Sequence, residues 1–245
     1  MRWKKTLTIC HLYPDLLDVY ADRGNVTVLE KRCAWRGIET QVHAICAGDA
    51  IDFSGADIVL IGTGAVNDQI KVCALRDTLS QPLKAYVEAG GVMLAIGESY
   101  RLLGNFFYAD GVRHDGLGVL DIDTHETETR FIGHFATEAI LGDLAVTLVG
   151  FEHHTGKTDI KAYAPFGRVI SGYGNDGCGY DGVVYKNTFG TYMHGPILPK
   201  NPELADRLIL LALEKKYGSA SLAPLEDEIA RKARSVVLER GMKDE

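Results

Sequence analysis

The fold of this chain is decided by the stretch Gly91-Val92-Met93-Leu94-Ala95-Ile96-Gly97-Glu98-Ser99-Tyr100-Arg101-Leu102-Leu103-Gly104. Its apolar first half predicts a short buried strand, and the change of pattern at Gly97 predicts a sharp turn into a helix. Such a turn presents its side chain at the carboxyl edge of a sheet, beside backbone N–H groups and the positive end of a helix dipole. A catalytic nucleophile would be stabilised there, but the turn residue is a glycine.

Strand-like and helix-like segments alternate before this stretch. Short apolar runs predict parallel strands covered on both faces, at 7–12, 40–44, 58–61 and 92–96. The spacing between them predicts helices over 25–35 with Asn25 as N-cap, over 67–79, and from Gln81-Pro82 to Glu88. From 111 to 190, alternating runs and Gly-rich turns predict antiparallel strands that extend the sheet edge. We therefore expect an α/β fold, with a mostly parallel sheet flanked by helices.

The last part of the chain predicts two further helices. Asn201-Pro202-Glu203 is typical of a helix start, and that helix is expected to reach about residue 217. After a linker, apolar residues recur near helical spacing at Leu225, Ile229, Ala233, Val236 and Val237. We expect one domain over residues 1–217, followed over 218–245 by a linker and an amphipathic helix that packs on the core or reaches a partner.

Composition excludes several classes of function. The 245 residues carry a formal net charge of -7, which gives no general attraction to nucleic acid or to an anionic membrane. The five cysteines are scattered without the spacing of a zinc site or a disulfide framework, so the sequence predicts no metal and a reducing, cytoplasmic location. No apolar run is long enough to predict a membrane span.

Candidate catalytic residues lie near the predicted elbow and about ninety residues later. His194, in the segment Gly190-Thr191-Tyr192-Met193-His194-Gly195-Pro196, has the position of a catalytic base. The alternative is a hydrogen-bonded histidine with a structural role alone. The loop Gly62-Thr63-Gly64 follows a strand and is placed either to donate N–H groups to a substrate oxyanion or to make a tight turn. Ser99 is an alternative nucleophile, shifted by two residues from the turn. His153 and His154 are adjacent on a predicted strand and point to opposite faces, which argues against a metal pair.

Several motifs together resemble one known family. They are His11-Leu12-Tyr13-Pro14-Asp15-Leu16-Leu17 through Tyr20, Asp22-Arg23-Gly24-Asn25, Trp35-Arg36-Gly37, Tyr100 with Leu102-Leu103-Gly104, Val149-Gly150-Phe151-Glu152-His153-His154, Gly172-Tyr173-Gly174-Asn175, Tyr185-Lys186-Asn187 and His194-Gly195-Pro196-Ile197-Leu198-Pro199-Lys200-Asn201. The chain resembles the small glutamine amidotransferase subunit of lipid II isoglutaminyl synthase, the GatD type, in the cobyric acid synthase-like branch of the class I amidotransferases. The resemblance covers most of the chain and implies a flavodoxin-like α/β fold.

The resemblance also implies a function. Subunits of this family hydrolyse glutamine and pass ammonia to a MurT-like, Mur-ligase-type partner in a heterodimer. That partner uses ATP to amidate the glutamate α-carboxylate of the lipid II stem peptide, a step of peptidoglycan synthesis that bears on cell wall biogenesis and cell shape. ATP is expected only on the partner, and no cofactor is expected on this chain. Arg130 matches a substrate-binding arginine of the family, and it either clamps a carboxylate bidentately or makes a surface ion pair. Gly62, Thr63 and Gly64 are further candidate substrate-binding residues.

The chain departs from the family at the elbow itself. The family pattern resembles Cys-Gly-Gly-Tyr-Gln-x-Leu-Gly, whereas this chain has Gly97-Glu98-Ser99-Tyr100-Arg101-Leu102-Leu103-Gly104. Loss of a covalent nucleophile costs on the order of 10⁶ in turnover, so we expect little or no glutaminase activity. Whether the chain is an enzyme therefore stays open. Three hypotheses remain: a noncatalytic partner of a ligase, an active hydrolase with a nucleophile such as Ser99, and a stand-alone protein that binds glutamine or a related small molecule.

Overall fold

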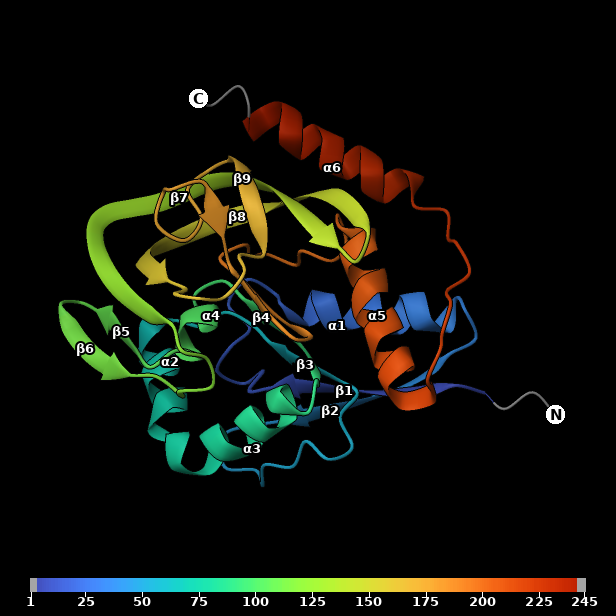
Figure 1. Ribbon diagram of the computed structural model, residues 1–245, viewed down its shortest axis with the longest axis horizontal. Coiled ribbons are helices and arrows are strands. Elements are labelled where there is room, and N and C mark those ends of the chain that lie inside the picture. Colours follow the sequence, from blue (N-terminus) through green and yellow to red (C-terminus); the bar gives the residue numbers. More distant parts are fainter. Residues whose placement is uncertain (1–3, 242–245) are drawn as a thin grey trace.

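A six-stranded sheet forms the centre of the fold, in the order β11-β12-β4-β3-β1-β2 (Figure 1). Its strands are β1 (Thr6–Leu12), β2 (Glu39–Ile45), β3 (Ile58–Ile61), β4 (Val92–Ile96), β11 (Val183–Tyr185) and β12 (Thr188–Thr191). All neighbouring strands pair in parallel except β11 and β12, which are antiparallel. The computed structural model describes residues 4–241 of the chain.

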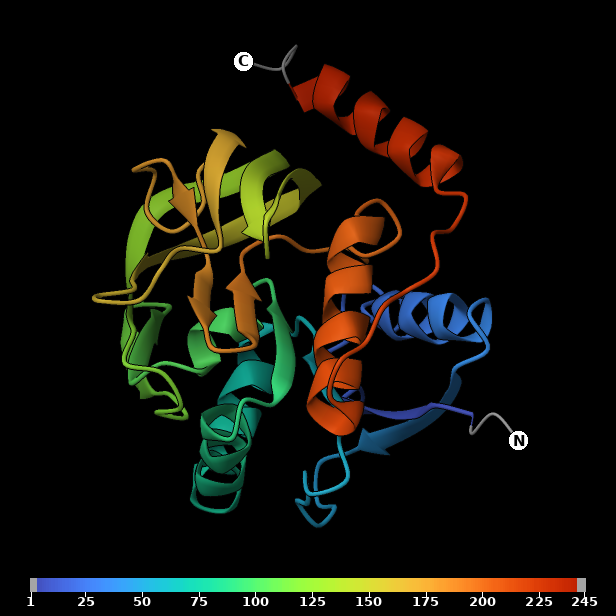
Figure 2. The ribbon, with the colours of Figure 1, turned by 45° about the vertical axis from the view of Figure 1, so that its right-hand side comes forward.

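Alternate side chains of this sheet enter two separate apolar cores. Ile58 and Leu60 belong to the core shared with α1 (Arg23–Ala34) and α5 (Pro202–Tyr217). Val59 and Ile61 belong to the core shared with α2 (Val66–Ala74) and α3 (Arg76–Glu88). This alternation is the period of two that a strand imposes on its side chains, and it explains why β3 is apolar at every position. Helices thus flank the sheet on both faces, with α1 and α5 side by side (Figure 2), and the predicted α/β class is confirmed.

The antiparallel strands form a second sheet. It contains β5 (Phe106–Ala109), β6 (Val112–Asp115), β7 (Asp123–Leu141), β8 (Leu144–Asp159), β9 (Gly167–Ser171) and β10 (Tyr180–Asp181). Pairing is antiparallel throughout, apart from a short parallel contact of β5 with β7. The sequence predicted that antiparallel strands throughout residues 111–190 extend the first sheet, but β11 alone does so, by pairing with β12. The rest is separate because the long β7–β8 hairpin packs Phe135, Ala139 and Leu148 into the core of α1 and α5.

The predicted start of the first helix is wrong. α1 begins at Arg23 after Asp22, so Asn25 lies inside the helix rather than at its N-cap. The buried Asn25 side chain instead accepts a hydrogen bond from the Leu198 N–H at 2.9 Å and so joins α1 to the segment that precedes α5. By contrast, Asn201 is the N-cap residue of α5, although its side chain binds the backbone of Val149 rather than the helix.

The expected helix over 67–79 is divided at Leu75 into α2 and α3, and Pro82 lies inside α3 instead of opening it. A proline inside a helix removes one backbone hydrogen bond and costs about 3 kcal/mol. Leu79, Leu83 and Val87 are fully buried in the second core. Burial of three such side chains, at roughly 1.5–3 kcal/mol each, outweighs the cost of the proline.

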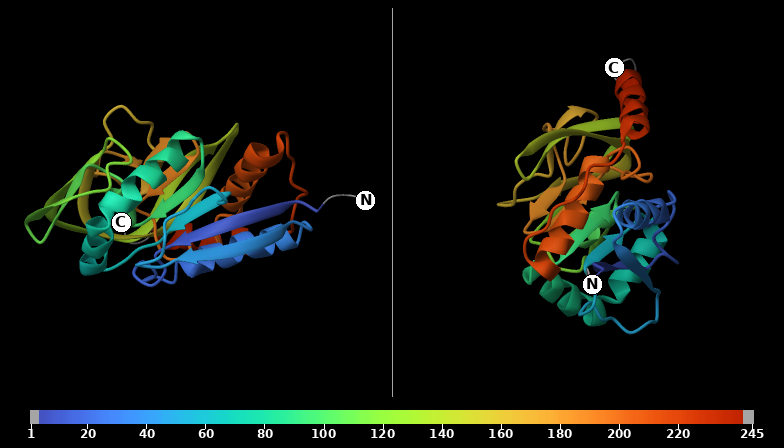
Figure 3. Two further views of the ribbon diagram at one scale, coloured as in Figure 1. Left: turned by 90° about the horizontal axis from the view of Figure 1, so that it is seen from below. Right: turned by 90° about the vertical axis from the view of Figure 1, so that its right-hand side faces the viewer.

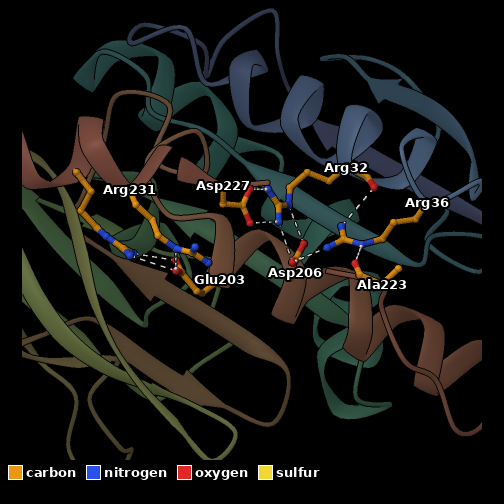
Figure 4. A network of polar contacts seen from close by, with 8 residues as sticks. Arg32, Arg36, Glu203, Asp206, Ala223, Asp227 and Arg231 are labelled. Carbon is orange, nitrogen blue, oxygen red and sulfur yellow. Dashed lines mark hydrogen bonds and ion pairs between the residues drawn. The ribbon is translucent and has the colours of Figure 1, made fainter. Parts of the chain in front are cut away.

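The C-terminal helix α6 (Glu228–Gly241) lies at one end of the molecule, over the second sheet and away from α3 (Figure 3). It does not bury the apolar face that the sequence predicted, because Ile229 is 85% exposed and Val236 47% exposed. Ion pairs join α6 and its linker to the domain (Figure 4). The buried Arg32 guanidinium binds Asp206 and Asp227, and Arg234 of α6 binds Glu203 of α5. Within residues 4–241, no helix is both long and apolar enough to cross a membrane.

Candidate functional site

The carboxyl ends of neighbouring parallel strands bring the predicted site residues together. Thr63 follows β3, Gly97 follows β4 and His194 follows β12. The Gly97 N–H donates to the Met193 carbonyl oxygen at 3.1 Å, which fixes the elbow against the histidine segment. A Cβ atom at position 97 would lie 3.3 Å from the Cβ of His194. The structure therefore forms the predicted elbow and places the histidine beside it.

Gly97 has no room for a side chain. Its φ of +61° lies in the left-handed region, which residues other than glycine rarely adopt. A Cβ atom there would overlap the Thr63 hydroxyl oxygen, which donates a hydrogen bond to the Ile96 carbonyl at 2.9 Å. The Thr63 hydroxyl thus fills the space in which a nucleophilic side chain would begin.

His194 lies in an apolar enclosure. It is 3% exposed, and its ring stacks on Tyr20 with centroids 4.0 Å apart and planes 7° from parallel. Neither ring nitrogen has a hydrogen-bond partner within residues 4–241. Burial, together with smaller contributions from the neighbouring His153 and His154, lowers the pKa of His194 to about 4. The imidazole is therefore neutral at physiological pH, and no acid among the described residues is hydrogen-bonded to it.

One N–H of the predicted oxyanion loop is already engaged. The Thr63 N–H donates to Asp22 Oδ2 at 2.6 Å, and Asp22 is buried. Burial raises the pKa of Asp22 to about 6, although its hydrogen bonds to Thr63 oppose the shift. Gly62 is needed for a close approach of chains, since a Cβ atom there would overlap the Leu17 carbonyl and Asp22. Gly64 is likewise packed against Leu16 and Leu17. The close approach of neighbouring segments, rather than a positive φ, therefore requires glycine at both positions.

Ser99 is the first residue of α4 (Ser99–Leu102) and is fully buried. Its hydroxyl oxygen has no hydrogen-bond partner within the described residues, whereas an activated serine requires a base within hydrogen-bond reach. The arrangement gives no support to Ser99 as a nucleophile.

A buried ionic cluster lies on the other side of the elbow, and the sequence analysis missed it. Arg101 is 1% exposed, and its Nη1 lies 3.2 Å from Glu98 Oε1. Gln69 of α2 joins both residues, because its amide accepts from Arg101 Nε at 3.1 Å and donates to Glu98 Oε2 at 3.2 Å. The only signal in the sequence is the change from the family's neutral Gly and Gln to Glu98 and Arg101.

A pocket of about 390 Å³ adjoins this cluster. Its wall includes Tyr20, Thr63, Gly64, Glu98, Arg101, Glu126, Arg130, His153 and His154. The sequence-predicted Arg130 and the substrate loop therefore line one cavity, whereas His194 does not, because Tyr20 covers it.

The two adjacent histidines have different surroundings. His153 Nδ1 lies 3.1 Å from the Tyr20 hydroxyl oxygen, and His154 stacks on Tyr192 with centroids 3.7 Å apart. No three His, Cys, Asp or Glu side chains within residues 4–241 are grouped to hold a metal ion.

Comparison with known proteins agrees with this geometry. The sequence pattern of the CobB/CobQ-like glutamine amidotransferase domain matches residues 8–202, which is most of the chain. The chain belongs to this amidotransferase family. Its relatives include the lipid II isoglutaminyl synthase (glutamine-hydrolyzing) subunit GatD of Staphylococcus aureus strain N315, 36% identical over 96% of both chains. The subunit of the same name from Streptococcus pneumoniae is 36% identical over 91% of this chain and 86% of its own.

Solved structures support the amidotransferase fold. The chain superposes on a chain of PurLQS from Thermotoga maritima with a TM-score of 0.60 at 14% identity, covering 85% of this chain and 98% of that one. The glutaminase domain of Trypanosoma brucei CTPS, solved with bound acivicin, gives a TM-score of 0.56 at 7% identity, covering 89% and 96%. At this identity the likeness concerns the fold alone. Within that shared fold, the elbow of this family member is closed by Thr63.

Proposed function

We propose that this protein is the amidotransferase-type subunit of a cytoplasmic complex that amidates the glutamate α-carboxylate of the lipid II stem peptide, and that its own glutaminase centre is inactive. Its partner is a MurT-like, Mur-ligase-type subunit, which alone binds ATP. The observation that carries the proposal is the filled elbow at Gly97 in a chain 36% identical to GatD subunits over nearly its whole length.

The chemistry supports inactivity on three counts. Glycine has no atom that can attack the amide carbon of glutamine, and the Thr63 hydroxyl leaves no space for a substitute. His194 is stacked under Tyr20 with a pKa of about 4, so it is a poor general base at neutral pH. The Thr63 N–H already has an acceptor in Asp22 and is not free for an oxyanion. A working glutaminase would need all three functions.

In this proposal the complex receives ammonia from solution or from another donor. The subunit's contribution is then to stabilise or regulate the ligase.

The deciding experiment is to co-express the chain with the Mur-ligase-like subunit, purify the complex, and measure amidation of lipid II with either glutamine or ammonium as nitrogen source. We expect a stable complex that amidates with ammonium and not with glutamine, and no release of glutamate from glutamine. Amidation that depends on glutamine would refute the inactive centre. Failure of the two chains to co-purify would refute the subunit role.

A further inference from the structure

The pocket beside the elbow contains a guanidinium whose hydrogen-bonding capacity is mostly unused. Arg101 has five N–H donors, and only Nε–H is engaged by a well-formed hydrogen bond, to Gln69. Nη1 is close to Glu98 without hydrogen-bond geometry, and neither Nη1 nor Nη2 has a hydrogen-bond partner within residues 4–241. Because buried donors on a charged group are costly to leave unsatisfied, this end of the pocket is suited to an anionic acceptor.

The Arg101 side chain is held rigidly in this position. Its guanidinium carbon lies 4.7 Å from the centroid of the Phe107 ring, and α4 and β5 hold the two residues against each other. A guanidinium that is fixed in this way loses little conformational freedom when it binds a carboxylate. Arg101, which forms the floor of the pocket, is therefore preorganised to bind a carboxylate.

A second guanidinium lies at the rim. Arg130 lies within the register shift in β7 between Glu126 and Phe131, a local irregularity of the kind that redirects side chains beside binding sites. Three acidic residues also line the pocket: Glu98 pairs with Arg101, Glu126 accepts the N–H groups of Asp110 and Gly111, and Asp110 is exposed.

We infer that this pocket binds an acidic amino acid, with L-glutamate as the reference ligand, in preference to the neutral amide L-glutamine. The two carboxylates match the guanidinium groups of Arg101 and Arg130, and the ammonium group matches the carboxylate of Glu98. A carboxylate offers the planar fork of arginine two charged acceptors, whereas a carboxamide offers one neutral acceptor. A cavity of about 390 Å³ lies within the range of small-molecule sites.

This inference rests on the proposed function in one respect: a pocket without a nucleophile retains its ligand unchanged. If the pocket retains its ligand, the subunit acts as an amino acid sensor. Occupancy of the pocket then signals to the complex how much of the acidic amino acid is available.

Isothermal titration calorimetry of the full chain with L-glutamate and with L-glutamine tests the inference directly. We expect L-glutamate to bind at least tenfold more tightly. Equal affinities, tighter binding of glutamine, or no saturable binding of glutamate would overturn it. Release of glutamate during the glutamine titration would instead refute the inactive centre, so the two failures are distinguishable.

Three variants assign the binding to the pocket. Arg101→Gln should abolish the preference for glutamate, because it restores a neutral amide at the floor. Arg130→Gln should weaken both ligands about equally, and it keeps the inference testable if Arg101→Gln does not fold. Arg168→Gln is the matched control, since Arg168 pairs with Glu138 on the second sheet and does not line the pocket. Loss of glutamate binding in all three, or in none, would contradict the assignment.

Discussion

The hydroxyl oxygen of Thr63 occupies the space in which any side chain at position 97 would begin. The two residues follow adjacent strands, and the Thr63 hydroxyl is held there by its hydrogen bond to the Ile96 carbonyl. The lack of a thiol is therefore not the only obstacle to a nucleophile at this elbow, because the Thr63 hydroxyl lies where its side chain would begin. We expect that restoring a nucleophile requires a change at Thr63 as well as at Gly97.

The first prediction concerns Gly97→Ala. We expect it to lower the free energy of unfolding by about 3 kcal/mol, since the left-handed φ costs about 1–2 kcal/mol and the overlap with Thr63 adds about 1–3 kcal/mol. Gly118→Ala is the matched control: Gly118 has the same φ of +61°, and nothing lies within 4 Å of a Cβ atom there. Chemical denaturation measures both variants. Equal losses would show that Thr63 does not obstruct position 97.

The second prediction concerns repair of the centre. Rebuilding the family elbow Cys-Gly-Gly-Tyr-Gln across residues 97–101 should give no glutaminase activity while Thr63 is present. Adding Thr63→Ala should permit slow release of glutamate, because it removes the two side-chain atoms nearest the new Cβ. The rate should stay far below that of an intact glutaminase, since His194 remains stacked under Tyr20. An active enzyme without the second change would contradict the steric argument.

The third prediction concerns pH. The folded pKa of His194, about 4, lies below the ordinary value of 6.5, so the unfolded chain binds a proton more readily between these two values. The contribution of His194 to stability is complete above pH 6.5 and is lost as the pH falls towards 4, by about 3 kcal/mol. NMR titration of the imidazole measures the pKa directly. His194→Phe should unfold with a smaller loss of stability over the same interval; an unchanged slope would rule out His194 as the titrating group.

The fourth prediction concerns the buried pair of Glu98 and Arg101. Glu98→Gln should destabilise the fold by about 3 kcal/mol, because it leaves a buried guanidinium without its counter-charge. The double variant Glu98→Gln/Arg101→Leu should recover much of that loss, since no buried charge remains. Thermal and urea unfolding of the two variants and the unmodified chain test this. A double variant less stable than Glu98→Gln would mean that Arg101 stabilises the fold through other contacts.

The fifth prediction concerns the attachment of α6. Asp227→Asn should weaken the contact with Arg32 by about 2 kcal/mol, because it removes a charged partner from a guanidinium that is 5% exposed. Hydrogen exchange of residues 228–240 should then accelerate, while exchange in α5 is unchanged. Glu138→Gln, which breaks an exposed pair with Arg168, should leave exchange in α6 unaltered.

The sequence predicted the central sheet well and the second sheet poorly, for physical reasons. β3 and β4 have the predicted bounds because a strand buried on both faces is a continuous apolar run ended by glycine. The β7–β8 hairpin has alternating apolar and polar residues. This pattern indicates that one face is covered, but it does not indicate which element covers it. The position of the hairpin is decided by its packing against α1 and α5, which are distant in the sequence. A local sequence pattern carries no information about such distant contacts.

The candidate site was also predicted only in part from the sequence. Its edge position was predictable, because the carboxyl ends of parallel strands converge and Gly97, Thr63 and His194 each follow one of them. The closure of the site was not, since the positions of the Thr63 hydroxyl and the Tyr20 ring depend on contacts between distant segments. Arg101 was not predicted to be buried, because an arginine three residues after a glutamate ordinarily indicates a solvated helix face.

The parallel stack of Tyr20 on His194 has a consequence for how such proteins are recognised. Because neither ring nitrogen has a hydrogen-bond partner within residues 4–241, the imidazole contributes a flat aromatic surface to the packing and does not accept a proton. A sequence search that scores amidotransferases by this histidine alone records that the residue is present, but not what surrounds its ring. The contacts of the ring, rather than the identity of the residue, decide whether it can accept a proton.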